Sequence, residues 1–546
     1  MKLFVRLVLL LCSSAIYAQT TLIHNVHGYS PTQKGELTTF TTLVFKDGKV
    51  VKTGNDSIID EFPQANKIDG KERTLLPGLI DAHGHIIGLG NNLLQLDLRG
   101  SQSVNEVGKK LQAYAAQAPK GWITGRGWDQ TLWPGKQFPT ARQLDEYIND
   151  RPVVLTRVDG HAVWTNSKAM ALAGINKDSD TPPGGEVIRL NNGQPSGVFI
   201  DKAEQLIVTH IPPATDEQRQ LALNTAGKHL LSLGITSAHD AGIEYATWHL
   251  YQQRAKQHTL PLRIYGMLSA GDSHLSEMLK HGVIKEKNDY LSIRSVKIYA
   301  DGALGSRGAA LLEDYHDRKG HKGLMLETQP QLETLLKQSF SHGYSAHTHA
   351  IGDKANRIVL DSYENIFNKV GGKLLRNRIE HAQIVHPNDI KRFKALSIIP
   401  SMQPIHATSD MHMAEQRLNN EQLRGAYAWQ TFLTQGSKIA AGSDFPVELA
   451  NPFHGLHAAV TRMSRNSQPK NGWRAQETLN REQALRAFTL DAAYAAFQEY
   501  KLGSLEQGKW ADFILVDKDY FKVNAAQIAD IQVLQTWLAG NLVYQR

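Results

Sequence analysis

Residues 76–85 are Leu76-Pro77-Gly78-Leu79-Ile80-Asp81-Ala82-His83-Gly84-His85, an apolar run that ends in two histidines. In a buried strand, side chains two residues apart point to the same side, so His83 and His85 would face the same way. Two neutral imidazoles at this spacing can hold one divalent cation. A pair of polar loop histidines is the alternative, because 23 histidines in 546 residues supply such a pair by chance and His347-Thr348-His349 is a second one. The pair therefore predicts a metal site only together with the rest of the chain.

Eight runs along the chain share one design, in which an apolar β-type stretch ends in polar residues and is mostly followed by a helical stretch. They are residues 79–85, 235–239, 262–267, 296–300, 344–349, 378–383, 398–403 and 438–444. Eight parallel strands, each followed by a helix, close into a barrel whose chemistry lies at the C-terminal ends of the strands. The sequence therefore predicts an α/β fold, a TIM-type (β/α)8 barrel within residues 76–490.

The interval between His85 and His239 is far longer than one βα unit, so we expect an insertion at about residues 100–230, after the first strand. Insertions at this end of a strand hang over the mouth of a barrel, where they can select the substrate. Trp and Asn at turns also serve packing and loop closure, which is the alternative for each candidate. The candidate substrate contacts in this insertion are Trp128, Asp129, His161 and Asn166.

Both ends of the chain carry short β-type runs, which predict one small β-sandwich domain built from residues 19–75 and 491–546. The runs are residues 21–26, 39–45 and 49–53 at one end and 511–517, 533–537 and 540–544 at the other. Asp47-Gly48 predicts a tight hairpin turn between the second and third runs. The pattern does not establish that strands from the two ends pair.

Residues 1–18 have the order of a secretory signal: the charged Lys2 and Arg6, a short apolar run, and small residues up to Ala18. We expect cleavage after Ala18 and a periplasmic or secreted protein. Cys12 is the single cysteine of the sequence, and a lipid anchor there is the alternative, although Leu11 stands where a small residue is needed. The mature chain would then have only His, Asp, Glu and Lys as metal ligands, and no thiol chemistry.

The net charge of +7 is spread along the chain without a basic block, which gives no support to a nucleic-acid partner. No stretch of about twenty residues is apolar and uncharged, so we expect no membrane span. A small-molecule substrate is the predicted partner. A homo-oligomer stays open, because the sequence shows no heptad pattern and no exposed apolar stripe.

Chemically competent residues stand in four of the later strand runs. Lys297 lies in the fourth run, His349 ends the fifth, Glu380-His381 belongs to the sixth, and Asp444 ends the eighth. In this combination the sequence resembles the amidohydrolase superfamily, in particular amidohydrolase family 3 and its YtcJ-like metal-dependent hydrolases, which include N-substituted formamide deformylases. The resemblance covers nearly the whole mature chain, including residues 503–506 and 508–512 near its end.

The resemblance implies one or two divalent metal ions, for which we expect zinc. It implies that His83 and His85 bind one ion, that His349 and His381 bind a second, and that Asp444 contacts metal and the attacking water. Lys297 matches a lysine that is carboxylated in many relatives and bridges the two ions. A carbamate supplies two oxygen ligands where an ammonium would repel cations. The alternative is an unmodified Lys297 held by a carboxylate such as Asp301, with a single metal.

The predicted reaction is hydrolysis of a carbon–nitrogen bond in a linear amide, a formamide or an N-acyl compound. A metal-activated water attacks the carbonyl, and Asp444 transfers its proton to the leaving nitrogen. Arg307 and His406 are further candidate substrate contacts. A dipeptidase or N-acyl amino acid deacylase is an alternative in which Arg307 would bind a substrate carboxylate. A non-catalytic periplasmic binding protein is the other, although no expected ligand is missing.

Overall fold

The computed structural model describes residues 20–118, 120–158, 161–182 and 184–546. The predicted signal segment, residues 1–18, lies outside the described residues, so export stays a prediction. The chain divides into two compact units. The larger contains the residues up to Leu89 and from Leu223 onward, and the smaller contains Gly90–Ala222. No helix within the described residues is both long enough and apolar enough to cross a bilayer.

The larger unit is built around a nearly closed barrel of eight parallel strands. In order around the barrel these are β6 (Leu79–Gly84), β13 (Ile235–Ile243), β14 (Arg263–Ser269), β16 (Leu291–Tyr299), β17 (Ser345–Ala350), β18 (Arg378–His381), β19 (Ile399–Met402) and β20 (Ala440–Ala441). The ring closes where the Asp444 amide donates to the His83 carbonyl (2.7 Å) and the His85 amide donates to the Phe445 carbonyl (2.7 Å). Each strand lies within one of the eight predicted runs or overlaps it, so the predicted barrel is confirmed.

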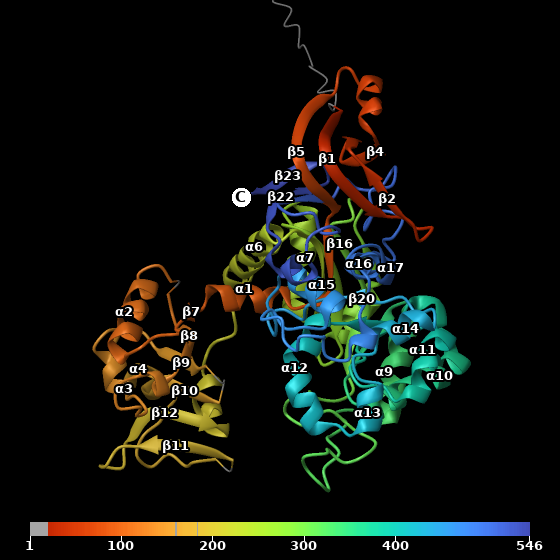
Figure 1. Ribbon diagram of the computed structural model, residues 1–546. Helices are drawn as coiled ribbons and strands as arrows, with labels where there is room; N and C mark the ends of the chain where they lie inside the picture. Colours follow the sequence, from red (N-terminus) through yellow and green to blue (C-terminus); the bar gives the residue numbers. More distant parts are fainter. Residues whose placement is uncertain (1–19, 119, 159–160, 183) are drawn as a thin grey trace, which may run out of the picture. The chain divides into compact units, whose positions relative to one another are not determined.

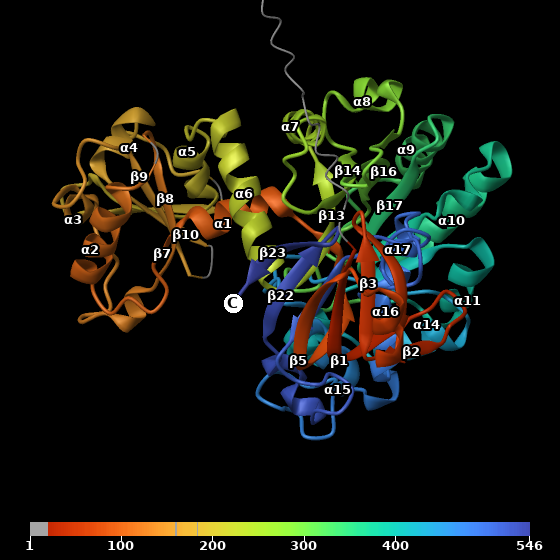
Figure 2. The same ribbon diagram turned by 90° about the horizontal axis from the view of Figure 1, so that it is seen from above.

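Helices cover the outside of the barrel, and Figure 2 shows α8, α9 and α10 outside β14, β16 and β17. Because alternate residues of a strand face opposite sides, Ile298 joins the apolar core outside β16 while Lys297 faces inward. Helix α10 buries Val359, Leu360 and Tyr363 in the same core. The helices of this unit are α6 (Asp216–Ser232, which begins in the smaller unit), α7 (Tyr245–Lys256), α8 (Leu275–His281), α9 (Gln329–Ser341), α10 (Asp353–Val370), α11 (Pro387–Leu396), α12 (Pro404–Arg417), α13 (Asn420–Arg424), α14 (Trp429–Thr434), α15 (Pro452–Thr461), α16 (Arg481–Ala487) and α17 (Leu490–Ala495).

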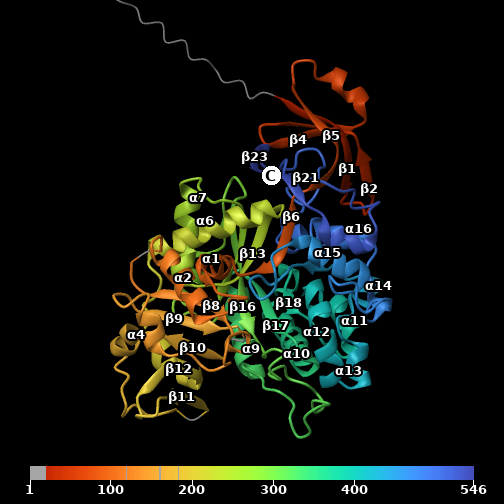
Figure 3. The same cartoon turned by 60° about the vertical axis from the view of Figure 1, so that its left-hand side comes forward.

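Strands from both ends of the chain form one mixed sheet of eight strands, in which β1 and β5 run parallel. Red strands β1 and β5 of this sheet are labelled in Figures 1 and 3, together with blue strand β22 in Figure 1 and blue strand β21 in Figure 3. The pairing of β5 with β21 joins the two ends of the chain directly. The strands are β1 (Thr21–Pro31), β2 (Leu37–Phe40), β3 (Thr42–Lys46), β4 (Lys49–Gly54), β5 (Asn66–Pro77), β21 (Phe513–Val516), β22 (Val533–Leu538) and β23 (Asn541–Gln545). A β-domain shared by both termini is thus confirmed.

The Asp47-Gly48 turn between β3 and β4 is also confirmed, with positive φ at both residues (52° and 72°). The predicted run 39–45 is in fact two strands, β2 and β3. Both β2 and β3 pair with β1.

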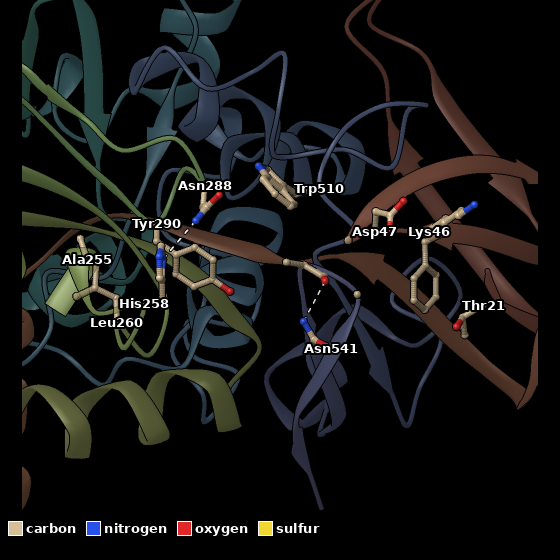
Figure 4. Close-up of a pocket in the computed structure, with 14 residues that line it drawn as sticks. Thr21, Lys46, Asp47, Ala255, His258, Leu260, Asn288, Tyr290, Trp510 and Asn541 are labelled. Atoms are coloured by element: carbon tan, nitrogen blue, oxygen red, sulfur yellow. Dashed lines mark hydrogen bonds between the residues drawn. The ribbon is translucent and has the colours of Figure 1, made fainter. Parts of the chain in front are cut away.

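A cavity of about 650 Å³ lies where the terminal sheet meets the barrel (Figure 4). Phe45 and Asn541 line it from the sheet, and Tyr290, Asn288 and His258 line it from the barrel side. None of its described lining residues belongs to the predicted metal or substrate site. The cavity is therefore distinct from the candidate active site.

The smaller unit has its own six-stranded sheet and its own apolar core. Trp128 and Trp164 lie in this core, which packs the sheet against short helices. Its elements are β7 (Leu96–Asp97), α2 (Val104–Ala115), β8 (Ile123–Trp128), α3 (Ala141–Asp145), β9 (Val153–Arg157), β10 (Ala162–Thr165), α4 (Ser167–Leu172), β11 (Gly185–Arg189), β12 (Pro195–Asp201) and α5 (Gln205–Val208), with α1 (Ile86–Leu94) leading in from the barrel. The insertion after the first barrel strand is thus a folded unit of its own.

Candidate active site

Strand β6 delivers His83 and His85 to the C-terminal end of the barrel, as the alternation of the strand requires. His83 is completely buried, and its Nδ1 lies 2.5 Å from Glu380 Oε2. His85 is partly exposed, and its Nδ1 lies 2.9 Å from the Ala241 carbonyl oxygen. Both rings are thereby held through Nδ1, and each Nε2 faces a third group; the Nε2 of His83 also faces Lys297.

That third group is Asp444, which follows β20 in a backbone conformation with φ of 63°. Its Oδ1 lies 3.2 Å from His85 Nε2 and 3.7 Å from His83 Nε2. Burial by itself would raise the pKa of Asp444, but the hydrogen bond with His85 and the nearby imidazoles outweigh it and hold this pKa well below its usual value. Asp444 is therefore an ionised carboxylate facing two imidazoles, an arrangement that suits a metal ion.

A second group of possible ligands shares Asp444 and adds His381 and His406. His381 ends β18, and its Nδ1 lies 2.8 Å from Gln403 Oε1. His406 lies in the first turn of α12, with its Nε2 3.8 Å from Asp444 Oδ2. In each of the two groups, His83–His85–Asp444 and His381–His406–Asp444, the ligand atoms lie within 4.8 Å of one another. His406, which the sequence predicts as a substrate contact, is thus close enough to Asp444 to serve either as a metal ligand or as a substrate contact.

His349, at the end of β17, lies beside this second group. Its ring centroid is 4.5 Å from that of His381, and its Nε2 is buried without a hydrogen-bond partner among the described residues. Burial, with a smaller effect of the Lys297 charge, lowers the pKa of His349 to about 3. His349 is therefore a neutral imidazole with an available nitrogen, and its predicted role as a ligand stays a prediction.

Lys297 faces the same space from β16. Its Nζ lies 3.2 Å from His83 Nε2, and the side chain is almost completely buried. Burial lowers the pKa of Lys297 to about 8, although the charges of Glu380 and Asp444 oppose this shift. The Asp301 carboxylate does not hold the lysine, because it accepts backbone N–H groups of Ala310, Ile351 and Gly352 instead.

Glu380 is a further residue of the candidate site, for which the sequence pattern predicted no role. It is completely buried, and its pKa is lowered to about 2 because the interactions with His83 and Arg378 outweigh the effect of burial. Its carboxylate orients the His83 ring and favours Nε2 as the nitrogen that can bind a metal. Its position directly before His381 in a buried strand is the sequence feature that could have identified it. A charged residue that is buried needs a partner, and His83 is that partner.

His239 and Asp240 lie in β13 and contact residues around the site. Asp240 accepts the Ile86 amide (2.9 Å) and the Tyr251 hydroxyl (2.5 Å). His239 Nδ1 lies 3.1 Å from an Arg378 guanidinium nitrogen beneath the metal-site histidines. Neither residue belongs to the two groups of possible metal ligands among the described residues.

The four candidate substrate residues of the insertion are placed within the smaller unit. Trp128 is completely buried, and its indole N–H donates to the Leu155 carbonyl (2.7 Å). Asn166 is also buried and caps α4. Asp129 pairs with Arg157, and His161 lies 2.9 Å from Asp201. Trp128 and Asn166 therefore hold the insertion together, and substrate contact by any of the four stays a prediction.

Arg307, the remaining candidate, belongs to the larger unit. Its guanidinium makes two hydrogen bonds to Asp317 (2.6 and 3.2 Å). The hydrogen bond and the charge of Asp317 raise the pKa of Arg307, with burial acting in the opposite sense. The charge of Arg307 is thus paired with Asp317 in the structure, and its contact with a substrate carboxylate stays a prediction.

The barrel and its cluster of histidines, aspartate and lysine define a metal-dependent hydrolase of the amidohydrolase superfamily. The chain belongs to the amidohydrolase family, whose model matches residues 67–544, and within it to the YtcJ-like branch. YtcJ of Bacillus subtilis is 30% identical over 95% of this chain and 98% of its own length. An N-substituted formamide deformylase of Arthrobacter pascens is 25% identical over 92% of this chain and 95% of its own length. The crystal structure of a metal-dependent hydrolase from Pyrococcus furiosus has a TM-score of 0.78 and 27% identity, and covers 92% of this chain and 100% of its own.

Proposed function

We propose that this protein hydrolyses a carbon–nitrogen bond in a neutral linear amide, with N-substituted formamides as the first class to test. The observation that carries the proposal is the convergence of His83, His85, His381 and His406 on Asp444 at the mouth of the barrel. The similarity to an N-substituted formamide deformylase supports the choice of substrate class. The paired charge of Arg307 argues against substrates that need a free cation there.

The residues of the site fit a divalent metal. Two buried side-chain atoms that face the site lack a hydrogen-bond partner among the described residues: His349 Nε2 and His406 Nε2. Burying such atoms without partners is costly unless a ligand satisfies them. His83, His85 and Asp444 would hold one ion, and His381 with His349 or His406 would hold a second. Nitrogen and oxygen ligands of this kind suit zinc, which lowers the pKa of a bound water and polarises a carbonyl.

Asp444 is the proposed general base and acid. It is ionised, buried and in contact with both groups of imidazoles, so it can accept a proton from the attacking water and return it to the leaving nitrogen. Because the pKa of Lys297 is about 8, much of its amine is neutral near that pH. The neutral amine can add carbon dioxide and lose a proton to give a carbamate facing His83. Glu380 and Gln403 keep the imidazoles of His83 and His381 in place.

The proposal is tested by incubating the purified protein with N-alkylformamides and measuring the release of formate and amine, before and after removal of metal with a chelator. We expect turnover that is lost with the metal and restored by zinc. Turnover that survives complete metal removal would overturn the role of the site. Absence of turnover on formamides and N-acyl amines, with metal bound, would overturn the substrate class.

A further inference from the structure

A groove of about 590 Å³ begins at the same strand end that carries Lys297. We call it the Tyr299 groove. Tyr299 and Ile298 line it from β16, Ala270 and Gly271 follow β14, and Pro330 and Leu335 belong to α9; Leu326, Glu327, Gln331 and Thr334 complete the lining. Its volume falls within the range of sites for small ligands.

Tyr299 lies between this groove and the two groups of possible metal ligands around Asp444, which we call the metal-type cluster. Its ring centroid lies 5.5 Å from that of His349, and Lys297 Nζ lies 5.0 Å from the same ring. A side chain at Gly242, which has a φ of +84°, would meet the Tyr299 hydroxyl at 3.3 Å. One wall of the groove is therefore also a wall of the active site.

The walls of the groove are fixed to the barrel by backbone hydrogen bonds. The Ala270 amide donates to the Lys297 carbonyl (3.0 Å), and the Leu326 amide donates to the Ala300 carbonyl (2.8 Å). Helix α9 begins beside the groove with a capping box at Thr328 and Gln331. The groove is thus a preformed feature of the strand ends that also position the catalytic groups.

Most of the lining residues are apolar, and two large apolar side chains among them are exposed, which fits a binding surface. Tyr299 is 40% exposed and Leu326 is 54% exposed. Among the described residues that line the groove, Glu327 is the one that carries a charge, so an anionic group would be repelled there. A neutral apolar group is the ligand that matches these walls.

We infer that the Tyr299 groove binds an apolar chain or ring attached to a neutral amide whose carbonyl lies at the metal-type cluster. This inference rests on the proposed function and names the substituent that the site selects. The apolar group can be attached to the nitrogen, as in an N-alkylformamide, or to the carbonyl, as in a straight-chain primary amide. The two arms of the test distinguish these sources.

The test compares kcat/KM of the metal-loaded enzyme along both series, from one to six carbons. In the series that uses the groove, each added methylene is expected to raise kcat/KM about 3- to 4-fold until the groove is filled. Leu326→Gln places an amide in the groove and should flatten this dependence on chain length. Leu324→Gln is the matched control, because Leu324 is 65% exposed two residues away and does not line the groove.

Binding of N-alkylureas, which are neutral and resist hydrolysis, gives a readout that does not depend on turnover. We expect calorimetric affinity to rise with chain length in the wild-type protein and in Leu324→Gln, but not in Leu326→Gln. If the affinity for the ureas follows this pattern while no amide is hydrolysed, the result supports the groove as an apolar binding site and contradicts the proposed function. If affinity in the wild-type protein does not depend on chain length, or if both substitutions have the same effect, the Tyr299 groove does not bind the apolar group.

Discussion

His83 Nδ1 lies 2.5 Å from Glu380 Oε2, and both side chains are completely buried. The two residues are 297 positions apart in the sequence and meet because β6 and β18 belong to the same barrel. A carboxylate on one imidazole nitrogen fixes the ring and favours the other nitrogen as a metal ligand. This contact therefore sets the orientation of the first predicted ligand.

Glu380→Gln should weaken metal binding, because the amide holds the His83 ring less firmly than a carboxylate does. We expect the affinity for zinc to fall about 10- to 100-fold, measured by competition with a chromogenic chelator. Glu333→Gln is the control, since Glu333 pairs with Lys369 on the outer helices. Equal zinc affinity in the wild-type protein and Glu380→Gln would show that the contact is only structural.

Asp444→Asn should abolish proton transfer while leaving the imidazoles in place. We expect kcat to fall by about 10² to 10⁴, with zinc content by elemental analysis nearly unchanged. Asp361→Asn serves as control, because Asp361 pairs with Arg392 on the outer surface. If activity survives in Asp444→Asn, the assigned proton transfer is wrong.

Lys297 should make the stability of the metal-free protein rise with pH in the alkaline range. Its pKa is about 8 in the folded protein, against an ordinary value of 10.5, so between these values the unfolded state binds more protons. Stability then increases as pH rises from 8 to 10.5, by about 3 kcal/mol for a shift of this size. The measurement is denaturant unfolding at several pH values in carbonate-free buffer.

Lys297→Met removes the titrating group and keeps the volume, so the difference between the two proteins isolates Lys297. Parallel pH profiles for wild-type protein and Lys297→Met would contradict the buried, shifted lysine. Adding bicarbonate to the metal-containing wild-type protein should raise activity only if the carbamate forms, and Lys297→Met should not respond.

Asn166→Ala should destabilise the insertion instead of altering the chemistry. Asn166 accepts the Ala169 and Val153 amides and donates to the Ile148 and Arg151 carbonyls, so its loss leaves several buried groups unpaired. We expect a loss of about 2–3 kcal/mol in unfolding free energy, with kcat/KM of the folded enzyme retained. Asn192→Ala, in an exposed turn, is the control. A raised KM at unchanged stability would instead establish substrate contact.

The order of the barrel strands and the direction of their key side chains could be predicted from the sequence. Local alternation decides that His83 and His85 share one side of β6, and each strand carries its own apolar pattern. The positive φ values that Asp47 and Gly48 adopt suit a tight hairpin, so this turn could also be predicted from the sequence. The single run 39–45 was wrong as one strand, because the register of β2 and β3 on β1 depends on pairing and not on local pattern.

The partners across the barrel were decided only by the tertiary structure. Examples are the contacts of His83 with Glu380, of Asp444 with His406 and of Lys297 with His83. These contacts depend on how the strands close into a ring, and no pattern within a single strand predicts them. For Trp128 and Asn166 the sequence could not show their burial in the core of the insertion, because turn residues and aromatic residues serve binding and packing alike; their contact with substrate stays a prediction. The sequence by itself determined the fold class and the set of ligand-type residues, because both follow from patterns within single strands, whereas the contacts that orient those residues arise between strands far apart in the chain.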